Sequence, residues 1–150
     1  MAAEDVRELL KREITPALYD RILQLWKAHS IAEDGRDIAG LIATLTPDCV
    51  YETVQTGHRW EGHKGATEFY TQLLGAFPDI HFDLINIVIG PQGVSEEARV
   101  TGTFKRDWVN YRATGKPVEF KVVIFFPWDM KLEKFRGERV YFDAKGITSP

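Results

Sequence analysis

The sequence predicts an α+β fold, because two kinds of hydrophobic periodicity occupy different parts of the chain. Up to about Phe77, apolar residues recur every three or four positions, which is typical of helices that bury one side. Beyond Pro78 and Asp79, long runs rich in β-branched and aromatic residues follow one another, with turn-forming residues between them. Helices first and a meander of strands afterwards predict an antiparallel sheet of about four to six strands, covered by the helices on one face.

The helical part is expected to begin with two helices that meet at a bend. Residues 4–33 have helical periodicity, but Thr15 and Pro16 place a capping residue before a proline suited to a first turn. A short helix capped by Asp37 should run to about Leu45, a turn should follow at 46–48, and a further helix is predicted over about 64–76. The second helix carries one apolar stripe, formed by Leu18, Ile22, Leu25, Trp26 and His29.

One of the predicted strands is apolar on both faces. Residues 122–126 alternate between apolar side chains on either side, so their strand should be central and covered on both sides. Because the helices can cover only one face, we expect a homodimer that buries the outer side of the sheet. The full set of predicted strands covers 49–56, a short segment around Trp60, and 81–89, 94–105, 117–128 and 135–143.

Length and composition predict one globular domain spanning residues 1–150. Of its residues 44% are hydrophobic and 27% charged, and the longest apolar run, 122–126, is far too short to cross a bilayer. The N-terminus lacks the basic-then-apolar order of a secretory signal, which predicts a cytoplasmic location. The single cysteine, Cys49, excludes an internal disulfide, and the formal net charge of −3 argues against nucleic acid as a partner. The expected partner is a small hydrophobic molecule.

The last predicted strand ends in a carboxylate that is a candidate general acid/base. Period two places Arg139, Tyr141 and Asp143 on one face, and Glu138, Val140 and Phe142 on the other. If the first face lines a cavity, desolvation raises the pKa of Asp143 while the arginine lowers it. The alternative is an ordinary aspartate at a strand end that caps the turn into residues 144–146.

Glu52 on the first predicted strand is the second candidate base. Period two leaves two arrangements open. Either Glu52 enters the pocket, or it points to solvent while Cys49, Tyr51 and Thr53 point inward.

Histidines and aromatic residues supply candidate binding groups. The four histidines show no metal-ligand spacing, so no metal site is predicted. His63 either caps the start of the helix near 64 or donates a hydrogen bond to a ligand. The aromatic side chains together would suit stacking on a flat hydrophobic ligand, with Arg139 close to them. The expected pocket lining includes Trp26, Tyr51, Phe69, Phe104, Trp108 and Tyr141.

Six short motifs occur in the order and spacing of one protein family. They are Trp60-Glu61-Gly62-His63-Lys64-Gly65, Phe69-Tyr70, Ala76-Phe77-Pro78-Asp79-Ile80-His81-Phe82, Thr101-Gly102-Thr103, Thr114-Gly115-Lys116 and Glu138-Arg139-Val140-Tyr141-Phe142-Asp143. In this order they resemble the SnoaL-like polyketide cyclases, also called ester cyclases, of the superfamily that includes nuclear transport factor 2 (NTF2) and ketosteroid isomerase. The resemblance covers about residues 38–146.

The resemblance implies an NTF2-like cone, in which a curved antiparallel sheet wraps around the helices and leaves a deep apolar pocket. It also implies a cyclase that needs no cofactor, in which Asp143 acts as general acid/base on a small hydrophobic carbonyl substrate. The chain departs from the family at Phe104, where relatives commonly have a histidine, and in the bulky basic loop 105–112. The alternatives are an isomerase, dehydratase or hydrolase on the same fold, or a non-catalytic ligand-binding or dimerisation module.

Overall fold

The computed structural model describes residues 4–148, which form helices and a six-stranded sheet. The helices are α1 (Val6–Leu9), α2 (Pro16–Asp34), α3 (Ile38–Ile42), α4 (Gly62–Ala76) and α5 (Lys145–Thr148). The strands are β1 (Leu45–Thr53), β2 (His58–Glu61), β3 (His81–Gly90), β4 (Gly93–Thr103), β5 (Pro117–Asp129) and β6 (Lys134–Phe142). The predicted α+β class is confirmed, with the helices concentrated before residue 77 and the long strands after it.

The predicted break before the main helix is confirmed. The Thr15 side chain accepts a hydrogen bond from the Leu18 amide, and Pro16 occupies the first helical turn of α2. The side of α2 that faces the sheet is buried, and it includes Ile22, Trp26 and the polar residue His29. No helix within residues 4–148 is both long and apolar enough to span a membrane.

The sheet has the order β2-β1-β6-β5-β4-β3 and is mixed rather than antiparallel throughout. The expected antiparallel pairing holds for every neighbouring pair except β1 and β6, which run parallel. A parallel pair needs a long connection between its strands, and here the chain from β2 to β5 supplies it. The turn expected at 46–48 lies inside β1, where the pairing with β6 shifts register between Leu45 and Val50. Pro47 therefore occupies an irregular stretch that makes no ladder bond.

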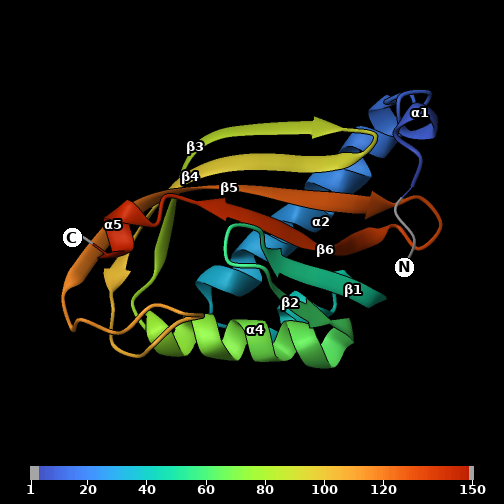
Figure 1. Ribbon diagram of the computed structural model, residues 1–150. Helices are drawn as coiled ribbons and strands as arrows, with labels where there is room; N and C mark the ends of the chain where they lie inside the picture. Colours follow the sequence, from blue (N-terminus) through green and yellow to red (C-terminus); the bar gives the residue numbers. More distant parts are fainter. Residues whose placement is uncertain (1–3, 149–150) are drawn as a thin grey trace.

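The long helices cover one face of the sheet, and most of its other face is open in the single chain, apart from a groove lined by Glu4, Val6 and Leu9. Figure 1 shows α2 crossing the long strands and α4 lying beside β1 and β2 at the other end of the curved sheet. Residues of β5 alternate between buried and exposed positions, so the strand is central but covered on only one side. Val123 on its outer face is 43% exposed.

A glycine in β6 decides which side chains of that strand face the interior. Gly137 has a φ of +109°, and a Cβ there would overlap the carbonyl oxygen of Val50 on β1. The β5–β6 pairing shifts register nearby, between Phe125 and Trp128. Beyond this irregularity Glu138 and Val140 point inward, while Arg139 points outward.

Replacing Gly137 by alanine is expected to destabilise the fold strongly. Positive φ alone costs an alanine about 1–2 kcal/mol, and the overlap with Val50 adds to it, so the free energy of unfolding should fall by about 3 kcal/mol or more. Gly57→Ala is the matched control, because Gly57 has a φ of +75° but nothing within 4 Å of an added Cβ. Urea denaturation measures both variants. Equal losses of unfolding free energy in the two variants would show that the close contact between Gly137 and Val50 does not limit the side chain at position 137.

Candidate active site

The interior of the cone contains a carboxyl group, that of Glu138, which is only 3% exposed. The Tyr70 hydroxyl donates a 2.5 Å hydrogen bond to its Oε2 atom. Nε2 of His29 lies 3.1 Å from the same oxygen. β6, α4 and α2 each supply one of these residues, so the contact joins the sheet to both long helices.

A chain of hydrogen bonds extends from Glu138 on both sides. The Tyr51 and Tyr70 hydroxyls are 2.8 Å apart, and because Tyr70 gives its proton to Glu138, Tyr51 is the donor to Tyr70. On the other side, Thr44 donates to the Leu41 carbonyl and therefore accepts from Nδ1 of His29, at 2.8 Å. The two ring nitrogens of His29 therefore both face oxygen atoms, Oγ1 of Thr44 and Oε2 of Glu138.

The negative charge of Glu138 influences the pKa values of two further carboxyl groups. Burial raises the pKa of Glu33 well above its usual range, and the negative charges of Glu138 and Glu96 raise it further. Burial also raises the pKa of Glu96 to about 8, with the Glu138 charge adding to the effect and a hydrogen bond from Trp26 opposing it. Glu96 therefore favours the protonated state near neutral pH, and the pKa of Glu33 is shifted in the same direction.

A small cavity of about 20 Å³ lies between the helices and the sheet. Two of its lining residues are acids, Glu33 and Glu138, and none is a lysine or an arginine. The rest of the lining is formed by Phe69, Leu73, Phe82, Val100, Trp108, Phe120, Val122, Ile124 and Val140. Drug-sized ligands occupy roughly 300–1,000 Å³, so this cavity is much smaller than the deep pocket expected from the resemblance. The aromatic side chains fill most of the interior.

The network also suppresses ionisation of the phenols and the thiol. Burial and the charge of Glu138 raise the pKa of Tyr51 and of Tyr70 well above the usual range. Burial raises the pKa of Cys49 to about 11. Among residues 4–148, no group of three histidine, cysteine, aspartate or glutamate side chains is placed to hold a metal ion.

Five of the predicted binding residues lie in the interior, in three different roles. Phe69 and Trp108 line the cavity. Trp26 and Tyr51 belong to the polar network, as donors to Glu96 and Tyr70. Phe104 is fully buried against Phe77, with ring centroids 4.8 Å apart, and belongs to the core.

The other predicted site residues lie away from the cavity. Asp143 is exposed just beyond β6, and its carboxylate accepts a hydrogen bond from the Lys145 amide, as in the turn-capping alternative. Tyr141 is 47% exposed on the outer face. His63 is partly buried at the start of α4, where its Nε2 lies 3.2 Å from the Leu45 carbonyl oxygen. A catalytic role for Asp143 stays a prediction, but this geometry gives it no contact with the interior.

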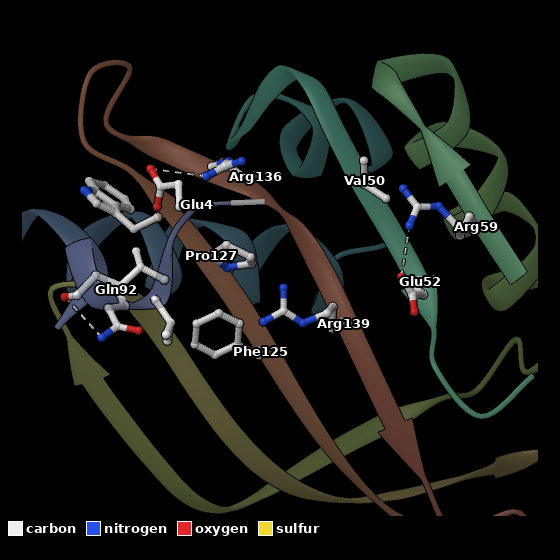
Figure 2. A pocket seen from close by; sticks show the side chains of 12 residues that line it. Glu4, Val50, Glu52, Arg59, Gln92, Phe125, Pro127, Arg136 and Arg139 are labelled. Carbon is white, nitrogen blue, oxygen red and sulfur yellow. Dashed lines mark hydrogen bonds and ion pairs between the residues drawn. The ribbon is translucent and has the colours of Figure 1, made fainter. Parts of the chain in front are cut away.

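Glu52 and Arg139 lie on the outer face of the sheet, where they line an open groove of about 460 Å³. Of the two arrangements left open for the first strand, the structure has Cys49, Tyr51 and Thr53 inward. Figure 2 shows Glu52 pointing toward Arg59, 3.4 Å away, and Arg139 beside Phe125. The guanidinium carbon of Arg139 lies 4.8 Å from the centre of that ring.

The acids that the structure brings together, Glu33, Glu96 and Glu138, are not among the site residues predicted from the sequence. Glu138 shares its strand face with Val140 and Phe142, and Glu96 alternates with Val94 and Ala98. In both cases the sequence shows a carboxylate on the same strand face as apolar residues, and this pattern could have indicated a buried acid. His29 on the apolar stripe of α2 was a third polar residue in such a pattern.

The comparisons with known proteins agree with this architecture. The chain matches the SnoaL-like domain over residues 26–130 and therefore belongs to that family. A solved structure from Jannaschia sp. CCS1, assigned as a SnoaL-like polyketide cyclase, has a TM-score of 0.77 at 18% identity, covering 93% of this chain and 99% of that one. An NTF2-like protein from Burkholderia thailandensis has a TM-score of 0.69 at 19% identity, covering 84% and 93%.

A structure of different chemistry also shares the fold. An LEH-like epoxide hydrolase from M. tuberculosis has a TM-score of 0.65 at 20% identity, covering 85% of this chain and 86% of that one. Among curated proteins, no sequence matches this chain. The fold is thus NTF2-like, and at these identities the likeness to solved structures establishes the fold alone.

The buried state of Glu96 predicts how stability depends on pH. In the unfolded chain Glu96 loses its proton near pH 4.5, whereas in the folded protein it keeps the proton up to about pH 8. Between these values the native state binds the extra proton, so the free energy of unfolding falls by roughly 1 kcal/mol per pH unit as pH rises. Glu96→Gln should remove this part of the slope.

Urea denaturation at several pH values between 5 and 8 measures the slope. Glu97→Gln is the matched control, because Glu97 lies on the same strand but on the outer face, opposite Val123. Identical slopes for the wild type and Glu96→Gln would show that Glu96 is not held protonated.

Proposed function

We propose that this chain is a cofactor-independent SnoaL-like enzyme, which uses two carboxyl groups, the buried Glu138 and the partly buried Glu33, for general acid/base catalysis on a small hydrophobic carbonyl compound. The observation that carries the proposal is the pairing of Glu138 and Glu33 in one apolar cavity. Glu138 receives hydrogen bonds that solvate a negative charge, while burial favours the neutral acid at Glu33. Environments that keep one carboxyl group charged and another protonated define a base and an acid.

The proposed reaction is an intramolecular aldol closure. The Glu138 carboxylate removes a proton from a carbon next to a carbonyl group, and the resulting enolate carbon forms a bond to a second carbonyl carbon. The oxygen of that second carbonyl takes the proton of Glu33. Glu138 then holds the proton taken from carbon, and exchange with solvent returns the pair to its starting state.

The lining favours neutral substrates. Its side chains are apolar apart from the two acids, so an anionic ligand would meet like charge with no lysine or arginine on the cavity wall. A substrate larger than a few atoms must displace part of the aromatic lining.

Hydrolysis is the second candidate, and the size of the cavity favours it. A cavity needs about 10–15 Å³ to hold a water molecule, and this one measures about 20 Å³ between a base and an acid. Glu138 would activate the water while Glu33 protonates the leaving oxygen of an epoxide, the substrate class named for the M. tuberculosis relative.

Glu138→Gln is expected to abolish most of the proton transfer from carbon. The probe is ethyl benzoylacetate in D₂O, and nuclear magnetic resonance (NMR) measures enzyme-catalysed deuterium exchange at its methylene group. A positioned base is worth roughly two to four orders of magnitude in rate, and the variant should lose that factor while its circular dichroism remains that of the wild type.

Asp143→Asn and Glu52→Gln are the controls, since both carboxylates lie outside the cavity. Glu33→Gln should affect exchange less than Glu138→Gln, because proton removal does not require the acid. A large loss of exchange in Asp143→Asn, with normal exchange in Glu138→Gln, would assign the catalytic role to Asp143. Loss in none of the variants would leave a ligand-binding module as the better description.

We also propose that the protein is a homodimer that uses the open outer face of the sheet. Val123 and Tyr141 are cross-strand partners on this face, 43% and 47% exposed. Val123→Glu should therefore halve the mass measured by light scattering at micromolar concentration, because it places a charge in the interface. Ile31→Glu is the control, at a residue 72% exposed on α2. A monomeric wild type would contradict the proposal.

A further inference from the structure

The indole of Trp108 carries a buried hydrogen-bond donor without a protein partner. The residue is 3% exposed and lines the cavity that contains Glu33 and Glu138. Its Nε1 atom is fully buried and makes no hydrogen bond within the described part of the chain. An unpaired buried N–H group costs stability unless a ligand or a water satisfies it.

The loop that carries Trp108 is a self-contained unit between β4 and β5. Trp108 and Tyr111 exchange two backbone hydrogen bonds, and the Asp107 carboxylate accepts one from the Ala113 amide. The backbone bonds to the rest of the protein lie at the base of the loop, where Lys105 and Arg106 donate to the Ala76 carbonyl. Figure 1 shows this loop beside the C-terminal end of α4.

Aromatic contacts hold the tip of the loop against the body. The Trp108 ring lies 5.2 Å from that of Phe142 and 5.8 Å from that of Phe77. The next residue, Val109, has a φ of +48°, which is a rare conformation for a β-branched side chain. Strain of this kind persists where the surroundings impose it, and it is frequent at ligand-binding sites.

We propose that Trp108 is the residue that recognises the carbonyl oxygen of the ligand, on a loop that moves to admit it. This inference rests on the proposed function and names the group that positions the substrate. A carbonyl oxygen is an acceptor that satisfies the indole N–H, and the two carboxyl groups line the same cavity as the indole. The ligand class is a neutral, largely apolar ketone or β-dicarbonyl compound.

The acceptor must come from a ligand or a water because the described protein atoms offer none, and the proposal assigns it to the ligand. Glu33 and Glu138 line the same cavity, yet neither bonds to the indole. A hydrocarbon of the same shape would fill the apolar lining but leave Nε1 unsatisfied. The site should therefore distinguish a ketone from its hydrocarbon analogue by one hydrogen bond, or about tenfold in affinity.

The first experiment uses the wild-type protein with 1-indanone and indane as probes. The chain contains four tryptophans, so a protein labelled with ¹⁵N at the indoles gives four N–H signals in NMR. Addition of 1-indanone should move the Trp108 signal to lower field more than the other three, and indane should not. A Trp108 signal that responds equally to both probes, or to neither, overturns the proposal.

The second experiment compares dissociation constants by calorimetry in two matched variants. Trp108→Phe should lose the roughly tenfold preference for 1-indanone over indane while still binding indane. Trp128→Phe should keep the preference, because the Nε1 of Trp128 is likewise buried and unpaired but its side chain lines the outer groove. A preference that survives in Trp108→Phe assigns carbonyl recognition to another residue.

The two proposals fail in different ways. Loss of ketone preference in Trp108→Phe together with normal deuterium exchange in Glu138→Gln would retain carbonyl recognition and reject the base. The reverse result would retain the base and reject Trp108.

Discussion

The structure is organised around one buried carboxyl group, that of Glu138. A carboxylate inside an apolar core is tolerated only if its oxygens are paired. Tyr70 and His29 provide the pairing from α4 and α2, and Tyr51 and Thr44 in turn hold these partners. The same contacts that solvate the charge therefore tie both long helices to β6, so the packing of the cone and its electrostatics rest on one set of hydrogen bonds.

Glu138 also influences the ionisation of its surroundings. Burial raises the pKa values of Glu33, Glu96, Tyr51 and Tyr70, and the negative charge of Glu138 raises them further. Glu33 lies at the C-terminal end of α2, where the helix dipole is also unfavourable to an anion. Two identical side chains thus have unlike environments, with a hydrogen-bonded carboxyl group at Glu138 and a poorly solvated one at Glu33.

Much of the fold follows from local sequence, whereas the site depends on long-range contacts. Thr15-Pro16, the caps and the alternation of β5 located the elements to within a few residues. The parallel pairing of β1 with β6 was not predicted, because no local pattern reports which distant strand a segment joins. The inward face of β6 was also missed, since period-two reasoning cannot show which face the core covers. The choice of face decides which acid of the closing segment points into the interior, and in the structure it is Glu138 rather than Asp143.

The buried acids are difficult to explain as structural elements. Replacing a buried ion pair by well-packed apolar side chains is often neutral or stabilising. A neutral acid at Glu96 or Glu33 also loses its hydration on folding, which costs stability unless hydrogen bonds compensate for it. The unpaired indole of Trp108 and the left-handed Val109 add further cost in the same small region. Several such features lie close to one cavity, although Thr46 and Trp128 also carry buried unpaired polar atoms outside its lining. Unfavourable features that gather at one place are expected where stability has been exchanged for function, and they are the reason for proposing a function for this cavity.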